Sequence, residues 1–478
     1  MNRTGAGMIH MSTDPRVASR KPAMPDETTR QLLHDACARA IHYLDGLDAR
    51  PVAPDIDAVA RLVALDTPLP AQAGDPADTL RTLDELGSPA TIASAGPRFF
   101  GFVIGGSLPV ALAADWLAGA WDQNSALYRV TPGTAVLEQV ALRWLLDVLG
   151  LPAGCGGAFV TGATTANLCA LAAARHAVLA QAGWDVEAQG LIGAPPVTIA
   201  IGEEAHPSVT KSLGILGLGR KRAIRVPVDG QGRMIAAQLP RLAGPTIICV
   251  QAGNVNTGAF DPIAEVCDRA RESGAWVHVD GAFGLWAAAA PSRAHLAQGI
   301  AGADSWATDA HKWLNVPYDS GLAFVRDAHA LQAAMAITAE YLPTESAHRN
   351  PGDFTPELSR RARGVAVWAV LHALGRAGVA DLIERNCAQA RRFADKLSAA
   401  GFEILSEVVL NQVLVSFGTA EHTLRVIERI QQEGTCWAGP TVWQGRTAMR
   451  ISVSSWATTD ADVDRSVEAI VRVAREAG

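Results

Sequence analysis

Between residues 157 and 325, short apolar segments alternate with longer segments in which apolar residues have helical spacing. The short segments at 197–201, 246–250 and 276–280 are apolar at almost every position. A strand of this kind is buried on both faces, which is typical of a parallel sheet covered by helices. This pattern constrains the fold more than any other feature, and it predicts an α/β architecture with a mainly parallel central sheet.

The pattern changes on both sides of this central region. Residues 1–26 mix charged residues with proline, and short helices are expected at 28–48 and 79–86. After Pro356, two helices are expected at 358–376 and 380–400, followed by strands that we expect to be antiparallel. The predicted organisation is an N-terminal tail with a helical segment, a large central domain and a small C-terminal α/β domain, at residues 1–95, 96–355 and 356–478.

Composition excludes several classes of function. The net charge of −7 gives no electrostatic basis for binding nucleic acid or an anionic membrane. We find no signal peptide at the N-terminus and no apolar stretch long enough to cross a membrane. The seven cysteines include no C-x-x-C pair, so reduced thiols in the cytoplasm are expected rather than disulfides or a metal site.

Lys312 is the most distinctive candidate for chemistry. It lies between His311 and Trp313, and it follows Asp280, which ends one of the predicted strands. A lysine amine in a partly dehydrated site is a nucleophile that condenses with aldehydes, and a carboxylate is the usual partner of a pyridinium nitrogen. Each residue alone is better explained as an ordinary loop lysine or a capping aspartate. Together they indicate pyridoxal phosphate.

Two further features support a bound anion and an aromatic ligand. The segment 161–167, Thr-Gly-Ala-Thr-Thr-Ala-Asn, joins a predicted strand to a predicted helix, where amides and the helix dipole bind phosphate. An ordinary helix cap explains it equally well. His206 follows another strand, where an imidazole can stack on a cofactor ring, although a structural histidine is the simpler interpretation. No histidine spacing supports a metal site.

In combination, these segments resemble the pyridoxal phosphate-dependent amino-acid decarboxylases, and in particular the aromatic L-amino-acid decarboxylase branch. The resemblance extends over residues 75–460 in family order. Its motifs are Gly-Ala-Thr-Thr at 162–165, Ala-His-Pro-Ser-Val at 205–209, His-Val-Asp at 278–280 and Asp-Ala-His-Lys-Trp-Leu at 309–314. It implies the aspartate-aminotransferase-type fold, known as fold type I, and decarboxylation of an L-amino acid through a Schiff base on Lys312.

The resemblance also implies a role for individual residues. Asp280 is expected to keep the pyridine nitrogen protonated, His206 to stack on the ring, and His311 to contact cofactor or substrate. The remaining expected cofactor contacts are polar or lie in the phosphate turn: Ala163, Thr164, Asn256, Asp309 and Ser320. The family further implies a homodimer with active sites at the subunit interface.

The sequence departs from the family in the loop that follows the lysine. In the aromatic decarboxylases a tyrosine of this loop supplies the final proton, whereas here Pro351, Asp353 and Phe354 lie near that position. His348 or Tyr341 can replace it as the acid. Without such an acid the product can be an aldehyde instead of an amine. An aldehyde synthase, a carbon–carbon lyase or a non-catalytic protein of this fold therefore remain alternatives.

The expected substrate pocket favours an aromatic or bulky apolar amino acid. Phe100 and Phe102 offer apolar surface, and burying such surface favours an apolar side chain. An acidic substrate needs a cation, because an unpaired buried carboxylate is costly. Arg129, which follows Tyr128, is a candidate for that cation, although a surface or interface ion pair is the simpler interpretation of its position.

Overall fold

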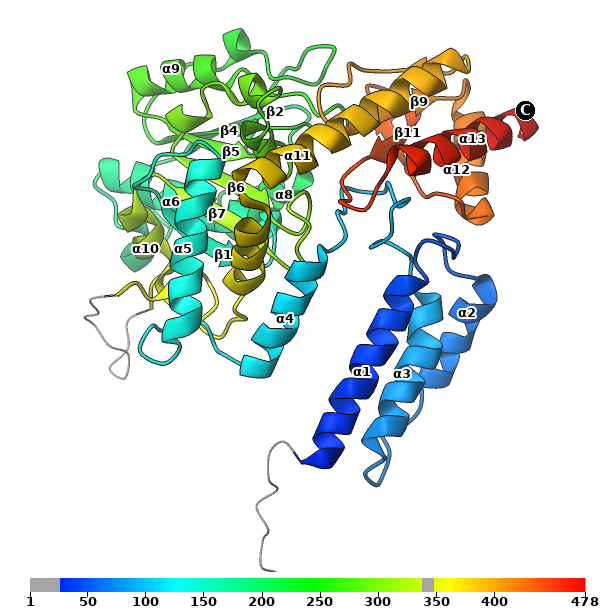
Figure 1. Cartoon of the computed structure of the whole chain (residues 1–478). Coiled ribbons are helices and arrows are strands. Elements are labelled where there is room, and N and C mark those ends of the chain that lie inside the picture. The colour runs from blue at the N-terminus through cyan, green and yellow to red at the C-terminus, as the bar shows by residue number, and fades with distance from the viewer. Residues whose placement is uncertain (1–25, 338–347, 478) are drawn as a thin grey trace, which may run out of the picture. The chain divides into compact units, whose positions relative to one another are not determined.

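The computed structural model describes residues 26–337 and 348–477, which form two compact units (Figure 1). The first unit lies within Met1–Leu47 and Pro54–Thr91, and the second within Asp48–Ala53 and Ile92–Gly478. The predicted boundary at residue 355, between a large and a small domain, falls inside the second unit and stays a prediction. Tyr341, a candidate acid, lies outside the described residues.

The first unit is helical. Its elements are α1 (Glu27–Asp45), α2 (Ile56–Ala60), a 3-10 helix η1 (Arg61–Leu65) and α3 (Pro76–Ala90). Aspartates cap three of them: Asp26, Asp55 and Asp75 each accept a backbone N–H of the first turn. The helices predicted at 28–48 and 79–86 are therefore confirmed, and their starts are set by these caps.

The second unit contains a seven-stranded sheet with the order β1-β7-β6-β5-β4-β2-β3. Its strands are β1 (Gly156–Val160), β2 (Thr198–Gly202), β3 (Ile224–Val226), β4 (Thr246–Gln251), β5 (Trp276–Asp280), β6 (Ser305–Asp309) and β7 (Gly321–Val325). Strand β7 is antiparallel to its neighbours β1 and β6, and the other neighbouring strands pair in parallel. The sheet is therefore mainly parallel, as predicted.

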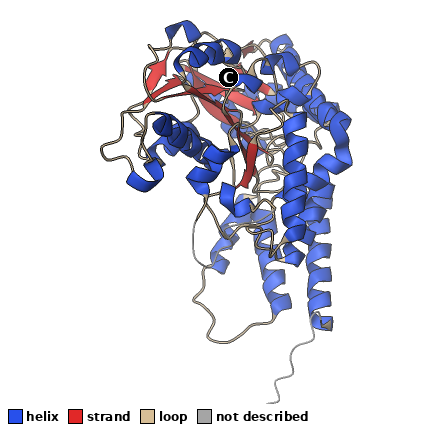
Figure 2. Ribbon diagram, turned by 90° about the vertical axis from the view of Figure 1, so that its left-hand side faces the viewer, coloured by secondary structure: helices blue, strands red, loops and turns tan. Residues whose placement is uncertain are grey.

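Helices cover both faces of this sheet (Figure 2). The helices of this part of the unit are α4 (Pro109–Trp121), α5 (Pro132–Val148), α6 (Ala163–Gln181), α7 (Val186–Gln189), α8 (Pro207–Ile215), α9 (Ile263–Ser273) and α10 (Ala328–Met335), with short 3-10 helices at Ala236–Gln238, Gly284–Ala289, Ala294–Ala297, Ile300–Gly302 and Pro351–Phe354. Successive strand residues enter opposite cores: Phe159 packs in one cluster, and Ala158 and Val160 in the other.

The C-terminal part of this unit has its own antiparallel sheet, with the order β10-β11-β9-β8. Its elements are α11 (Gly364–Ala399), β8 (Glu403–Ile404), β9 (Gln412–Ser416), α12 (Ala420–Glu433), β10 (Gly439–Trp443), β11 (Arg446–Ser452) and α13 (Asp460–Glu476). The antiparallel strands expected after residue 400 are confirmed. The sequence interpretation did not include β10.

By length and composition, α11 is apolar enough to cross a membrane. Its backbone is interrupted at Gly375, which has a left-handed φ of 58°, and this position separates the two helices predicted at 358–376 and 380–400. Val367 and Val370 before the break, and Phe393 after it, are fully buried in the protein core. This burial is typical of a core helix, so its apolar composition is explained by packing.

The parallel topology brings separate sequence segments to one edge of the large sheet. Asp280 ends β5, Asp309 ends β6, and the turn at Gly162 follows β1. The carboxyl ends of parallel strands form the crevice where open α/β sheets bind ligands. The predicted catalytic residues Lys312, Asp280, His206 and His311 meet at this edge.

Candidate active site

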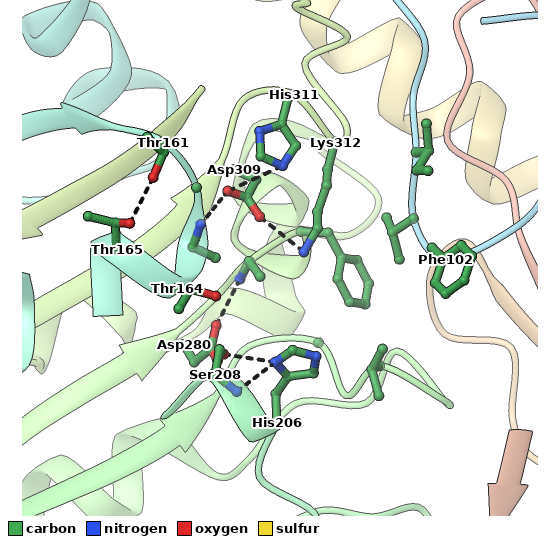
Figure 3. Close-up of a pocket in the computed structure, with 18 of the residues that line it drawn as sticks. Phe102, Thr161, Thr164, Thr165, His206, Ser208, Asp280, Asp309, His311 and Lys312 are labelled. Carbon is green, nitrogen blue, oxygen red and sulfur yellow. Dashed lines mark hydrogen bonds and ion pairs between the residues drawn. The ribbon is translucent and has the colours of Figure 1, made fainter. Parts of the chain in front are cut away.

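A cavity of 460 Å³ lies at this edge of the sheet. Its wall includes the turn before α6, the ends of β5 and β6, and the segments around Phe102, Gly253 and Arg450. Figure 3 shows that Lys312, Asp280, Asp309, His206 and the first turn of α6 surround one space, although they come from different elements. The fold thus gathers the predicted catalytic residues around a single cavity.

Lys312 lies just after β6, where Trp313 and Leu314 are fully buried and anchor the segment. Its side chain extends into the cavity, and its Nζ lies 3.0 Å from Oδ2 of Asp309 (Figure 3). Within the part of the chain that the structure describes, this is the ion pair found for Lys312. Its amine is therefore both held by a neighbour and accessible from the cavity.

Asp280 is a buried carboxylate that forms no ion pair with any described lysine, arginine or histidine. Its Oδ2 accepts hydrogen bonds from Asn167 Nδ2 at 3.2 Å and from Ser208 Oγ at 3.4 Å. Behind it, Nε2 of His278 donates to Oδ1 of Asn167 at 2.8 Å, and Nδ1 lies 2.9 Å from the Ser305 hydroxyl. Burial lowers the pKa of His278 to about 4. His278 is thus neutral, and Asp280 remains available for a cationic ligand.

The two histidines of the cavity, His206 and His311, are also neutral. Burial lowers the pKa of both His206 and His311 below the ordinary value for histidine. The Ser208 N–H donates to Nδ1 of His206, and the Ser320 N–H donates to Nδ1 of His311. Since Nδ1 is the acceptor in each ring, the proton of the neutral imidazole is on Nε2. His206 is a flat, neutral ring beside Asp280 (Figure 3).

The first turn of α6 is built to receive an anion. Gly162 precedes it, and a Cβ at this position would lie 3.2 Å from Cε1 of His311, so a side chain would crowd the cavity. The hydroxyls of Thr161 and Thr165 form a hydrogen bond of 2.8 Å, and Thr164 lines the same wall of the cavity. The amides of a first helical turn have no partner within the helix, and the helix dipole adds positive potential.

These features fit pyridoxal phosphate, the cofactor that the sequence implied. The amine of Lys312 can condense with the aldehyde of this cofactor. Asp280, which has no ion-pair partner among the described residues, can pair with its protonated pyridine nitrogen. The first turn of α6 offers amides and hydroxyls for a phosphate. Among the described residues no group of histidine, cysteine or acidic side chains could hold a metal ion.

Several predicted cofactor and substrate residues do not line the cavity of this chain. Asn256 Oδ1 accepts from Thr441 on β10, and Ser320 lines a smaller neighbouring cavity. The remaining residues outside the wall are Phe100, which packs edge-on against Phe393, Tyr128, which stacks on His348, and the exposed Arg129. Their roles stay predictions. Of the predicted substrate residues, Phe102 lines the cavity.

The structure adds three residues whose importance the sequence did not show. Ser208 and Asn167 support Asp280, and Tyr318 stacks on His311 with ring centroids 4.3 Å apart. Ser208 and Asn167 lie within the segments 205–209 and 161–167 already noted, so their positions were a usable signal. Tyr318 lies on the loop after Lys312 and enters the wall only because this loop folds back onto His311.

Arg450 is a second cation in the wall of the cavity, besides Lys312. It lies on β11, and burial lowers the pKa of its guanidinium. Nη1 donates to the Val255 carbonyl at 3.3 Å, and among the described residues Arg450 forms no ion pair with a carboxylate. A half-buried arginine without an acidic partner is suited to a ligand carboxylate.

The sequence matches a family model described as the pyridoxal-dependent decarboxylase conserved domain over residues 67–419. Tryptophan decarboxylase 1 of Oryza sativa subsp. japonica is 27% identical, and the match covers 94% of this chain and 95% of that protein. The L-2,4-diaminobutyrate decarboxylase of Rhizobium meliloti (strain 1021) is 31% identical over 77% of this chain and 75% of that protein.

The fold agrees with solved structures. The crystal structure of Oryza sativa TDC with pyridoxal phosphate and tryptamine superimposes with a TM-score of 0.87, covering 95% of this chain and 99% of that chain at 24% identity. At this identity the likeness establishes the fold, which is fold type I as predicted. The family match covers most of the chain. The chain therefore belongs to the pyridoxal-dependent decarboxylases, and it is a pyridoxal phosphate-dependent carboxy-lyase that acts on an amino acid.

Proposed function

We propose that this enzyme decarboxylates an aromatic or bulky apolar L-amino acid and that Lys312 is the residue that binds the cofactor covalently. The observation that carries this proposal is the pair of Lys312 and Asp280. An accessible amine and a buried carboxylate without an ion-pair partner face one cavity. Pyridoxal phosphate supplies an aldehyde that condenses with amines and a ring that accepts the electron pair released as the carboxylate leaves as CO2.

The chain's own residues have separate tasks in this proposal. Asp280 accepts the N–H of the pyridine ring and keeps the nitrogen cationic, while Asn167 and Ser208 hold the Asp280 carboxylate in place. His206 provides a neutral face against the ring. Ala163 and Thr164 bind the phosphate at the first turn of α6, where the helix dipole favours an anion.

The substrate preference rests on the composition of the cavity wall. Phe102, Val103, Ile104, Val255 and Phe283 contribute apolar surface to it. Burying apolar surface stabilises the complex by roughly 25 cal/mol per Å², which favours an aromatic over a small polar side chain. Arg450 is suited to the carboxylate that every amino-acid substrate carries, which leaves no second free cation among the described cavity residues for an acidic side chain.

An aldehyde synthase is the second candidate, because residues 348–354 contain no tyrosine to supply a proton. His348 stacks on Tyr128 outside the cavity of this chain. Release of CO2 without ammonia or peroxide indicates a decarboxylase that forms an amine. Release of CO2 with ammonia and peroxide indicates an aldehyde synthase.

A panel of L-amino acids tests the substrate. We expect Phe, Tyr or Trp to give CO2 with a higher kcat/KM than Glu, Asp or 2,4-diaminobutyrate. If an acidic or diamino substrate has the highest kcat/KM, the apolar interpretation is wrong. If no amino acid on the panel releases CO2 but a carbon–carbon bond is cleaved, the lyase alternative replaces decarboxylation.

Attachment of the cofactor is tested by reduction. Borohydride should remove the visible absorbance of the loaded enzyme and leave a pyridoxyl group on Lys312, which peptide mass spectrometry locates. A pyridoxyl group on another lysine, or on none in fully loaded protein, contradicts the assignment.

We also propose a cytoplasmic homodimer whose active sites lie at the subunit interface. The outer face of α4 exposes Trp116, Leu117 and Trp121, an apolar group that a second copy can cover. All seven cysteines are free thiols, which suits a reducing compartment. Sedimentation should give twice the chain mass of 50.2 kDa. A monomer with full activity contradicts the proposal of a shared site.

A further inference from the structure

Asp309 places a carboxylate at the point where the proposed function places the cofactor phosphate. Its side chain is 3% exposed, and its Oδ1 accepts the N–H of Ala163, the first residue of α6, at 2.6 Å. Gly162 precedes α6 and has no side chain to cap the helix, so Asp309 provides the cap from β6. The protein thus brings its own anion to the first turn of this helix (Figure 3).

The groups around Asp309 supply one permanent positive charge. Lys312 Nζ lies 3.0 Å from Oδ2, and His311 Nε2 lies 3.6 Å from Oδ1. His206 and Tyr318 also lie within its electrostatic reach, but burial keeps His206 and His311 neutral and raises the pKa of the Tyr318 phenol to about 12. Asp280 is the other carboxylate of the cavity wall, and Arg450 its other cation.

A phosphate at the amides of Thr164 and Thr165 would lie next to the amide that Asp309 already occupies. A phosphate monoester carries a charge between −1.5 and −2 at neutral pH, because its second pKa is about 6. Two anions at one helix terminus repel each other, and in a site with little water this repulsion is only weakly screened. One proton on either oxygen removes a negative charge and turns the repulsive contact into a hydrogen bond.

We propose that Asp309 makes this site bind its cofactor together with one proton, taken from solvent and shared between the Asp309 carboxylate and the phosphate. This inference rests on the proposed location of the phosphate at α6. Asp309 is then a positioning residue with two states. Without cofactor it caps α6 and pairs with Lys312; with cofactor it contacts the phosphate as one partner of a shared proton.

The test measures the affinity of the cofactor-free full chain for 4′-deoxypyridoxine 5′-phosphate, which carries the phosphate but has no aldehyde to react with Lys312. Between about pH 6.5 and about pH 8.5, where the free phosphate has largely lost its second proton and binding must take one up, the dissociation constant of the wild type should rise steeply with pH. In Asp309→Asn the dissociation constant should rise with pH more slowly. Its increase per pH unit should be about tenfold smaller than that of the wild type, which corresponds to one proton fewer taken up on binding.

The matched control is Asp327→Asn. Asp327 caps α10 through the His329 N–H and lies outside the cavity wall, and the substitution removes the same charge while asparagine retains a capping oxygen. This variant should keep the pH dependence of the wild type. Equal slopes for the wild type and Asp309→Asn would overturn the inference. A wild type that does not bind the analogue at any pH would overturn the proposed cofactor site and this inference with it.

A second measurement covers the case in which Asp309→Asn does not fold. Calorimetry of the wild type at about pH 8, in two buffers of different ionisation enthalpy, counts the protons taken up on binding. The phosphorylated analogue should take up about one proton more than 4′-deoxypyridoxine, which lacks the phosphate but has the same ring nitrogen. Equal uptake by the two ligands contradicts the inference.

Discussion

The inner wall and the mouth of the cavity are built differently. The inner wall consists of Asp280, Asp309 and Lys312, whose polar atoms are held by neighbours from α6, α8 and the sheet. The mouth consists of Phe102, Tyr318 and Arg450, and the side chains of Phe102 and Tyr318 are 64% and 54% exposed in this chain. The inner wall is therefore complete within one chain, whereas the mouth depends on what covers it.

This difference separates reaction type from substrate choice. Strand ends and a helix terminus fix the inner wall, so small changes there should affect the chemistry itself. The mouth is held by fewer contacts: Phe102 has a left-handed φ of 59° and rests on Trp437, with ring centroids 5.8 Å apart. Changes at the mouth should affect binding of the substrate.

Lys312→Ala should lower kcat by on the order of a thousandfold or more, because the residue that reacts with the cofactor is lost. The variant should still bind pyridoxal phosphate, without the absorbance of a Schiff base. Steady-state CO2 release and a visible spectrum measure the two effects. Lys211→Ala, on the exposed face of α8, is the matched control and should behave as the wild type. A variant of Lys312 with near-normal kcat would contradict the inner-wall assignment.

Asp280→Ala should lower kcat by roughly a hundredfold to a thousandfold in protein saturated with cofactor, because the ring nitrogen loses the charge that keeps it protonated. KM should change much less, since Asp280 does not face the mouth. Kinetics at saturating cofactor test this split. If KM rises and kcat stays within about threefold of wild type, Asp280 acts in binding and the separation between wall and mouth fails.

The support of the inner wall should be sensitive to acid through His278. Its pKa is lowered from 6.5 to about 4 by burial, so the neutral ring is favoured in the folded state. The free energy of unfolding is then highest above pH 6.5 and falls as pH decreases towards 4, by at most about 3 kcal/mol for this group. Below pH 4 its contribution no longer changes.

His278→Gln removes the titrating group and should flatten this part of the pH dependence. Urea unfolding of cofactor-free protein at about pH 7 and about pH 4.5 measures the difference. The exposed His295 provides the control His295→Gln, which should retain the loss of stability of the wild type. An unchanged loss of stability in His278→Gln would show that another group causes it.

Arg450→Gln should raise KM by about tenfold, because a charge-assisted hydrogen bond to the substrate carboxylate is lost. We expect kcat to remain within about threefold, in contrast to the inner-wall variants. Kinetics with the preferred substrate and with its amine product as inhibitor separate the two cases. The amine has no carboxylate, so its inhibition constant should not change; an equal rise for both ligands would indicate a structural effect.

Phe102→Ala should have the smallest effect, a KM increase of up to about tenfold for an aromatic substrate, from the loss of apolar contact. Small apolar substrates should be affected less, so the preference for aromatic substrates should shrink. A ratio of kcat/KM for Phe over Ala that does not change would show that Phe102 does not contact the substrate side chain.

Much of the inner wall could be predicted from the sequence because its residues follow strands. β5 was predicted with the bounds that the structure shows, and the turn at Gly162 and Lys312 follow apolar segments of the same sheet. Local patterns identify such strands, and parallel topology brings their ends together. Asp309 was named as a cofactor contact, but its bond to the Ala163 N–H could not be predicted, since it joins residues far apart in sequence.

The sequence by itself determined the fold class and the cofactor, and it predicts Lys312 as the reactive lysine, because hydrophobic periodicity and short motifs are local properties of the chain. Tertiary structure alone decided that Phe100, Asn256 and Ser320 face other neighbours, and that Tyr318 and Arg450 reach the cavity. The physical reason is that side-chain direction depends on packing between distant segments. Arg450 comes from β11 of the C-terminal sheet and reaches the cavity because β11 packs beside Val255.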